Sequence, residues 1–316
     1  MKWHKVFRLT ALVLVVYGLL AGVAGILVCE GALHPSRRPL SESDRQLAQA
    51  LANRHTSRLQ DVDLLATDGV VLRAWLLIPQ TPNRTAVILL HGVSDNRMGM
   101  MGYAELLLKH GYTILMPDAR AHGASGGPVA TYGLLERKDL RDWFQLLQRT
   151  THPACIDGFG ESMGAAQLLQ ALTVEPDFCS VGAESSFASL REIGYDRVGQ
   201  FFHTGSWIGR TIFRPVIDVA FWWGKQKYHL DLEQASPQSA VANSQPPVLL
   251  IHGTADDNIP YRHARLTASH APHLVLWTVP GANHCGAITT AHDFDVRLIQ
   301  WFTDHDKRSL AVAAID

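Results

Sequence analysis

The chain has 316 residues, of which 47% are hydrophobic, so it can bury the core of one large domain or of two small ones. Its 28 lysine and arginine residues are balanced by 29 acidic residues, and this formal net charge of −1 gives no basis for nucleic-acid binding. The four cysteines lack CxxC spacing, so neither a zinc ribbon nor a dithiol redox site is expected.

The N-terminus predicts a membrane anchor. Residues 9–29 carry no charge, and at about 1.5 Å rise per residue they are long enough to cross a hydrocarbon core of about 30 Å. Lys2, Lys5 and Arg8 precede this span, which predicts that residues 1–8 are cytoplasmic and that the rest of the chain lies outside the cytoplasm. A cleaved signal and a buried helix are the alternatives. The run exceeds the usual apolar region of a signal, and the residues after it form a weak cleavage site.

The remainder reads as a polar linker at residues 30–55, a domain at residues 56–308 and a tail at residues 309–316. Short apolar runs alternate with segments of helical period, which predicts an α/β fold with a mostly parallel sheet and helices on both faces. The expected strands end at turn residues and lie at 58–66, 70–79, 86–92, 112–120, 155–160, 180–186, 247–253 and 274–281. The first two are separated by Asp68-Gly69, a hairpin signal.

Residues 190–235 interrupt this alternation. The segment is rich in aromatic side chains and has no clear strand, so it predicts a helical insertion between two strands. Two interpretations have equal weight. The insertion adds core, or it forms a cap whose apolar face lines a pocket for an acyl group or another apolar substrate.

Two serines occupy G-x-S-x-G patterns, Ser125 in "GASGG" and Ser162 in "GESMG". The pattern alone has low specificity, so the flanking elements decide between them. Ser162 follows an expected strand and precedes an expected helix, the arrangement that exposes a nucleophilic hydroxyl on a sharp turn. Ser125 lies in a glycine-rich loop that Pro128 closes. Ser162 is therefore the candidate nucleophile.

A serine nucleophile needs a base, and the base needs an orienting carboxylate. In a parallel sheet both should follow later strands at the same edge as the serine. Asp256 and Asp257 follow the strand expected at 247–253, and His284 follows the last one. The order Ser, Asp, His is that of α/β-hydrolases.

Five motifs together resemble the α/β-hydrolase superfamily of serine hydrolases, and in particular its serine aminopeptidase-like and prolyl oligopeptidase-like branches. They are "LLHGVSDNR", "PDARAHGASGG", "GFGESMGAAQ", "LLIHGTADDNIP" and "VPGANHCG". The resemblance implies that Asp256, rather than Asp257, is the acid and that His284 is the base. It also implies an oxyanion hole made by the backbone N–H groups of Val93 and Met163. Ala121 replaces a family glycine in a loop whose role is structural.

Other polar residues have structural interpretations. His91, His252 and His122 are expected to be hydrogen-bonded supports, and Cys285 a packed thiol, although it adjoins His284. Asp118 is a minor alternative acid. Cys155 and Cys179 begin neighbouring strands, so they form either a disulfide or two buried thiols. The chain lacks HExxH, acidic calcium-loop and Walker patterns, so no metal or nucleotide cofactor is expected.

The sequence thus predicts a membrane-anchored serine hydrolase of carboxylic esters or thioesters, acting through an acyl-enzyme on a small or lipid-like acyl substrate. A peptidase or amidase of the same fold is the first alternative. A catalytically silent binding protein is the second, and the fold alone does not separate these functions.

Overall fold

The computed structural model describes residues 2–271 and 273–306, so the predicted tail at 309–316 lies outside the described residues. The chain divides into two units. One contains the chain up to His34 together with Leu190–Gln234, and the other contains Pro35–Ser189 and the chain from Ala235 onward. The larger unit carries the sheet, and it is described first.

The sheet has eight strands in the order β1-β2-β4-β3-β5-β6-β7-β8. β1 pairs with β2, and β2 with β4, in antiparallel fashion, whereas the other neighbours are parallel. This confirms the predicted α/β-hydrolase fold with a mostly parallel sheet. The strands are β1 (Ser57–Leu65), β2 (Val71–Pro79), β3 (Thr85–Leu90), β4 (Thr113–Pro117), β5 (Cys155–Glu161), β6 (Val181–Glu184), β7 (Val248–Gly253) and β8 (Val275–Val279).

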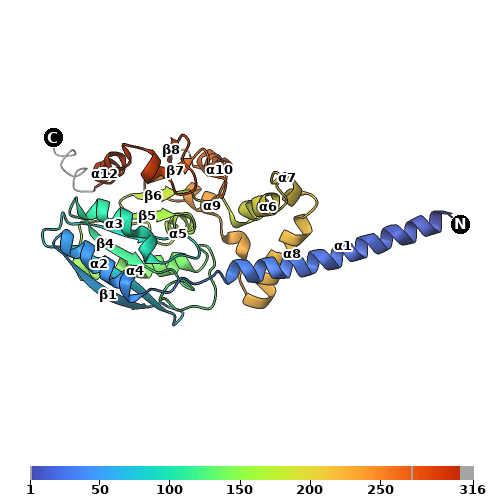
Figure 1. Cartoon of the computed structure of the whole chain (residues 1–316), viewed down its shortest axis with the longest axis horizontal. Helices are drawn as coiled ribbons and strands as arrows, with labels where there is room; N and C mark the ends of the chain where they lie inside the picture. The colour runs from blue at the N-terminus through green and yellow to red at the C-terminus, as the bar shows by residue number, and fades with distance from the viewer. Residues whose placement is uncertain (1, 272, 307–316) are drawn as a thin grey trace. The chain divides into compact units, whose positions relative to one another are not determined.

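Successive residues of a strand point to opposite faces of the sheet. Both faces of this sheet are apolar, so helices cover both of them. In β3, Ala86, Ile88 and Leu90 join one core cluster, and Val87 and Leu89 join the other. The first cluster packs against α4 (Glu136–Thr151), α5 (Met163–Ala171), α9 (Pro237–Ala242) and α10 (Arg262–His270). The second packs against α2 (Glu42–Arg54), α3 (Met101–Leu108), α11 (Ala287–Thr290) and α12 (Phe294–Asp304). Figure 1 shows this layering.

The segment predicted as a linker contains α2. Ser41 caps this helix, since its side chain accepts a hydrogen bond from the backbone of Asp44, whose carboxylate accepts one from the backbone of Ser41. Ala48, Leu51 and Ala52 are buried in the second core cluster. The second half of the 30–55 segment is thus part of the sheet-containing unit.

The smaller unit is helical. It consists of α1 (Lys2–Leu33), α6 (Leu190–Phe201), α7 (Trp207–Arg210), α8 (Arg214–Tyr228) and the short 3₁₀ helix η2 (Leu232–Gln234). From Trp3 to Leu33, α1 is long and apolar enough to cross a membrane, a property that signal sequences share. Its N-terminal end extends beyond the other helices of this unit (Figure 1).

The C-terminal half of α1 packs along α8. Ala21, Gly25, Cys29 and Leu33 are buried and recur every fourth residue, so they form one stripe on the helix. The two backbones approach closely at Gly25, where an added Cβ would lie 2.6 Å from the carbonyl oxygen of Val216. A side chain larger than hydrogen at Gly25 would therefore push α1 away from α8.

Candidate active site

Ser162 lies on the bend between β5 and α5. Its backbone has φ 51° and ψ −112°, a positive φ that is costly for a residue with a Cβ. Two glycines make this bend possible. An added Cβ would lie 2.6 Å from the carbonyl carbon of Gly164 if placed on Gly160, and 2.3 Å from the carbonyl oxygen of Leu90 if placed on Gly164. The bend therefore tolerates only glycine at these two positions.

His284 and Asp256 follow β8 and β7, and both lie beside this bend. Nδ1 of His284 is 2.9 Å from Oδ2 of Asp256, and Nε2 of His284 is 3.0 Å from Oγ of Ser162. Because an ionised carboxylate only accepts hydrogen bonds, Nδ1 carries the proton and donates to Asp256. Nε2 is then free to accept the hydrogen bond that the Ser162 hydroxyl donates.

The environment of Asp256 keeps its carboxyl ionised. Burial raises the pKa of Asp256, but hydrogen bonds from His252 and His284 outweigh burial and hold that pKa well below its usual range. Oδ1 also accepts hydrogen bonds from the backbone N–H groups of Ile259 at 2.8 Å and Asn258 at 3.1 Å. The neighbouring Asp257 is exposed. The carboxylate in contact with His284 is thus the one that the sequence motif indicated.

The loop that follows β3 lies against Ser162. A Cβ added to Gly92 would be 3.6 Å from Cβ of Ser162, so the backbone leading to Val93 passes close to the hydroxyl-bearing side chain. Met163 begins α5 directly after Ser162, so its N–H belongs to the first turn of that helix. The two predicted oxyanion donors therefore belong to segments that adjoin Ser162.

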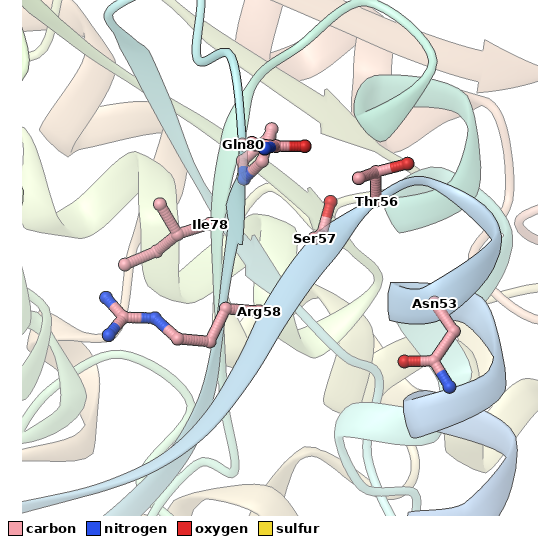
Figure 2. A pocket seen from close by; sticks show the side chains of 7 residues that line it. Asn53, Thr56, Ser57, Arg58, Ile78 and Gln80 are labelled. Atoms are coloured by element: carbon pink, nitrogen blue, oxygen red, sulfur yellow. The ribbon is translucent and has the colours of Figure 1, made fainter.

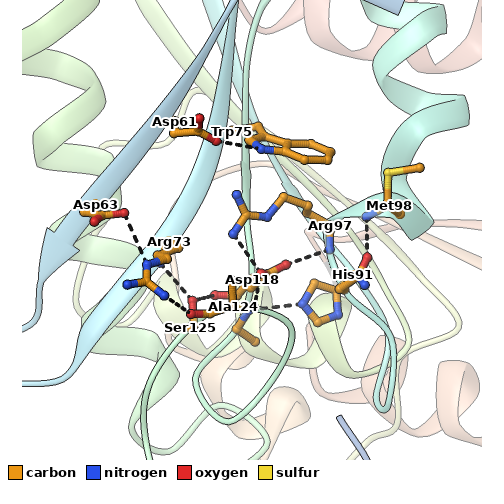
Figure 3. A network of polar contacts seen from close by, with 12 residues as sticks. Asp61, Asp63, Arg73, Trp75, His91, Arg97, Met98, Asp118, Ala124 and Ser125 are labelled. Carbon is orange, nitrogen blue, oxygen red and sulfur yellow. Dashed lines mark hydrogen bonds and ion pairs between the residues drawn. The ribbon is translucent and has the colours of Figure 1, made fainter. Parts of the chain in front are cut away.

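A buried polar network holds this loop in place (Figure 3). His91 is fully buried, and burial lowers its pKa to about 4, so the ring is neutral at physiological pH. Its Nδ1 donates to the carbonyl oxygen of Gly92 at 2.7 Å, and its Nε2 accepts from the backbone N–H of Ala119 at 3.1 Å. His91 therefore joins the loop after β3 to the loop after β4, and its role is structural.

Asp118 and Arg97 form the centre of the same network. Their side chains are almost completely buried and their charged atoms are 2.7 Å apart. Asp118 also accepts hydrogen bonds from the backbone N–H groups of Arg97 at 2.8 Å and Ala124 at 2.7 Å. The carboxylate of Asp118 is thus occupied by a structural ion pair, and the alternative that it serves as the catalytic acid has no support in this geometry.

Ser125, the second G-x-S-x-G serine, belongs to this network as well. Its buried hydroxyl donates to the carbonyl oxygen of Asp118 at 2.7 Å and accepts from the backbone N–H of Arg73 at 2.9 Å. Both hydrogen-bonding functions of the hydroxyl are used in joining β2 to the loop after β4 (Figure 3). The structure therefore gives Ser125 a supporting role.

A pair of glutamates beside Ser162 was not identified from the sequence. The hydroxyl of Tyr103 lies 2.6 Å from Oε1 of Glu161 and 2.9 Å from Oε2 of Glu184, and Oε1 of Glu184 accepts from the N–H of Ala287 at 2.8 Å. A phenol has one hydrogen, so it donates to one carboxylate, and the other contact requires a protonated carboxyl. Burial, together with the charge of Glu184, raises the pKa of Glu161 to about 8. The two carboxyls thus hold at least one proton at neutral pH. Their hydrogen bonds with Tyr103 and Ala287 connect the bend at Ser162 to the helix that follows His284.

The cysteines fall into two groups. Cys155 and Cys179 form a disulfide, which decides between the two alternatives that the sequence left open. Cys285 is partly buried, and burial with the nearby carboxylates Glu161, Glu184 and Asp256 raises the pKa of its thiol far above the usual range. Cys285 is therefore a protonated, weakly nucleophilic thiol, as expected for a packing residue.

A metal site and a second pocket were also considered as candidate sites. Within residues 2–271 and 273–306, no group of three or more His, Cys, Asp or Glu side chains is arranged to hold a metal ion. A depression at the edge strands is lined by Asn53, Thr56, Ser57, Arg58, Ile78, Pro79 and Gln80 (Figure 2). It contains none of the residues of the candidate active site.

Comparisons with known proteins agree with the fold. The profile described as "Alpha/beta hydrolase family" matches residues 87–295. The uncharacterized protein YqkD of Bacillus subtilis is 30% identical over 245 residues, which cover 75% of this chain and 76% of YqkD. YfhR of Escherichia coli, also uncharacterized, is 26% identical over 74% of this chain and 76% of its own length.

Solved structures show the same architecture. An esterase from Pyrococcus furiosus superposes with a TM-score of 0.67 at 23% identity, over 86% of this chain and 98% of the esterase. A puromycin-hydrolyzing peptidase from Mycobacterium tuberculosis superposes with a TM-score of 0.55 at 17% identity, over 73% of this chain but 36% of the peptidase. At these identities the similarity is one of fold.

Proposed function

Because this chain belongs to the alpha/beta hydrolase family, we propose that it is a serine hydrolase that cleaves carboxylic esters or thioesters through an acyl-enzyme intermediate. One observation carries the proposal. The hydroxyl of Ser162, the imidazole of His284 and the carboxylate of Asp256 form a continuous line of hydrogen bonds at a strained bend. Structural serines rarely need a base held in a fixed tautomer, whereas a nucleophilic serine does.

The chemistry follows from the positions of the protons. His284 removes the proton of the Ser162 hydroxyl through Nε2 as the oxygen attacks the substrate carbonyl. Asp256 stabilises the resulting imidazolium through the proton on Nδ1. His284 then donates this proton to the leaving alcohol or thiol. Water next attacks the acyl carbonyl while His284 removes a proton from it, and the carboxylic acid leaves as His284 returns that proton to Oγ of Ser162.

The tetrahedral intermediate needs donors for its negative oxygen. We assign this role to the backbone N–H groups of Met163, at the positive end of α5, and Val93, in the loop held by His91. Each such donor contributes about 3 kcal/mol to lowering the barrier. Because both act through the backbone, the side chains at these positions are not expected to determine activity.

A fluorophosphonate probe tests the nucleophile. It is expected to label the wild-type protein and the Ser125→Ala variant, and to fail on Ser162→Ala. Ser125→Ala is the matched control because Ser125 lies in the other G-x-S-x-G pattern. Equal labelling of wild type and Ser162→Ala would reject Ser162 as the nucleophile, and absence of labelling in the folded wild type would favour the silent binding protein.

The preference for esters is a separate part of the proposal. The apolar anchor and the aromatic insertion favour acyl substrates, and the esterase from Pyrococcus furiosus is matched over nearly its whole length. The structural similarity to a puromycin-hydrolyzing peptidase keeps amide cleavage as the second candidate. p-Nitrophenyl esters of graded chain length should turn over faster than aminoacyl anilides, and the opposite result would establish the peptidase alternative.

We also propose that α1 is a retained anchor and that the enzyme faces away from the cytoplasm. The buried stripe of α1 on α8 supports retention, because cleavage would expose the apolar face of α8. Lys2, Lys5 and Arg8 before the span support the orientation, and the Cys155–Cys179 disulfide is typical of an oxidising compartment. The intact mass of the membrane-extracted protein tests retention: a species that lacks the N-terminal segment would show that it is a cleaved signal.

A further inference from the structure

The connection between α7 and α8 is held against the middle of α1. The hydroxyl of Tyr17 donates a hydrogen bond to the carbonyl oxygen of Ile212, so the two residues lie at the same level along the helix. Tyr17 lies within the uncharged run at residues 9–29, eight residues after its first residue, or about 12 Å at about 1.5 Å per residue. A hydrocarbon core is about 30 Å thick, so a membrane crossed by this run extends past Tyr17. The level of Ile212 then lies within that membrane.

The residues around this level present an apolar surface. Phe201, Trp207 and Ile212 have 78%, 57% and 52% of their surface exposed. Phe202 connects them to the start of α8, since its ring lies 5.0 Å from that of Phe201 and stacks at 4.6 Å on that of Phe213. We name this group, Phe201, Phe202, Trp207, Ile212 and Phe213, the Phe201–Phe213 surface. Clustered exposed aromatic side chains of this kind mark an interaction site rather than a surface in water.

The opposite end of the same helix pair has a polar boundary. Glu30 accepts hydrogen bonds from Nε1 of Trp223 at 2.6 Å, Nζ of Lys227 at 2.8 Å and the hydroxyl of Tyr228 at 2.7 Å. Trp, Tyr and Lys are the side chains enriched at the membrane–water interface. Glu30 lies 13 residues beyond Tyr17, about 20 Å along the helix, so the unit passes from an apolar level to an interfacial one.

We infer that the Phe201–Phe213 surface is inserted among the lipid acyl chains of the membrane that α1 enters. The inference rests on the proposed anchor and goes beyond it, because a tethered enzyme needs no lipid contact outside its tether. The occupant of the surface is the bilayer, since the Tyr17–Ile212 hydrogen bond makes the surface continuous with the membrane-spanning helix.

Two arginines flank the surface, and both are paired with carboxylates. Arg210 forms an ion pair with Glu192, and Nε of Arg214 lies 3.5 Å from Oδ2 of Asp218. Pairing with carboxylates lowers the cost of placing these charges near the acyl chains.

Spin labelling of the full-length protein in phosphatidylcholine vesicles tests the inference. A nitroxide is attached to a cysteine introduced at Phe201, Trp207 or Ile212, and its collision rates with oxygen and with a water-soluble nickel chelate are measured. Leu14, 63% exposed on α1, is the lipid control, and the exposed Gln148 on α4 is the water control. Wild-type protein treated with the same reagent gives the blank for the native thiols.

The three test positions should have an oxygen-to-nickel accessibility ratio similar to that of Leu14 and several-fold higher than that of Gln148. Ratios equal to that of Gln148, with Leu14 in lipid, would overturn the inference and leave the anchor intact. A water-like ratio at Leu14 would reject the anchor and this inference together. Fluorophosphonate labelling of each spin-labelled protein reports the hydrolase proposal independently of all these outcomes.

Discussion

Oγ of Ser162 lies 3.0 Å from Nε2 of His284, although 122 positions of the chain separate the two residues. The sheet brings them together, since β5 and β8 both run parallel to β7 and end at the same edge. The bend that presents Ser162 depends on glycine at two positions, and the tautomer of His284 depends on Asp256. The dependence of His284 on Asp256 leads to a measurable prediction.

Replacement of Asp256 by asparagine should lower kcat by about 10³- to 10⁴-fold. The amide can donate to Nδ1 of His284, which favours the tautomer whose Nε2 carries the proton and cannot accept the one on Ser162. Asp257→Asn is the matched control, because Asp257 is exposed and adjoins Asp256. Steady-state kinetics with a p-nitrophenyl ester measure both variants, and a larger loss in Asp257→Asn would show that the acid has been misassigned.

The shared proton of Glu161 and Glu184 should make activity depend on pH. As the pH rises through the pKa of Glu161, about 8, a negative charge appears beside Ser162 and opposes the developing oxyanion. The titratable groups near this carboxyl are the hydroxyl of Tyr103, the carboxylates of Glu184 and Asp95, and the protonated thiol of Cys285. We expect kcat/KM of the wild type to fall above pH 8 and Glu161→Gln to show a weaker fall. Coincident profiles would contradict this assignment.

The same pair predicts the sign of a stability change. The pKa of Glu161 is raised on folding, so the folded protein retains a proton that the unfolded chain releases between its pKa, near 4.5, and about 8. Wild-type stability should therefore decrease across this window. Glu161→Gln should gain stability relative to wild type from pH 5 to pH 8, by a few kcal/mol at most because Glu161 is only partly buried. Urea unfolding at several pH values measures the difference, and a constant difference would contradict the prediction.

Elements that are indicated by a few adjacent residues could be predicted from the sequence. Short, fully buried strands such as β3 and β7 consist of continuous apolar runs that end at glycine or turn residues, so all eight strands could be located. Ser162 could be preferred to Ser125 because the strand before it and the helix after it are adjacent in the chain. The catalytic roles of Ser162, Asp256 and His284 remain predictions until activity is measured.

Contacts between distant segments that share no motif could not be predicted from the sequence. Glu161, Tyr103 and Glu184 come from β5, α3 and β6, and nothing in their local patterns indicates a common proton. The spacing of Ala21, Gly25, Cys29 and Leu33 is visible as a row of small and apolar residues, but within an apolar helix it does not identify α8 as the partner. Pairing of this kind depends on three-dimensional packing.

The buried ion pair of Arg97 and Asp118 supports the loop that carries Val93, and its removal should be costly. Arg97→Met leaves the carboxylate of Asp118 buried without its cation, which should lower the free energy of unfolding by about 3–5 kcal/mol. Arg97→Met combined with Asp118→Asn removes both charges, so it should recover a substantial part of this loss. Arg297→Met is a matched control, because the pair that Arg297 forms with Asp293 is half exposed and should contribute less than about 1 kcal/mol. Urea denaturation of the four proteins gives the values. Equal losses for Arg97→Met and Arg297→Met would contradict the prediction that the buried pair contributes more to stability than the exposed one.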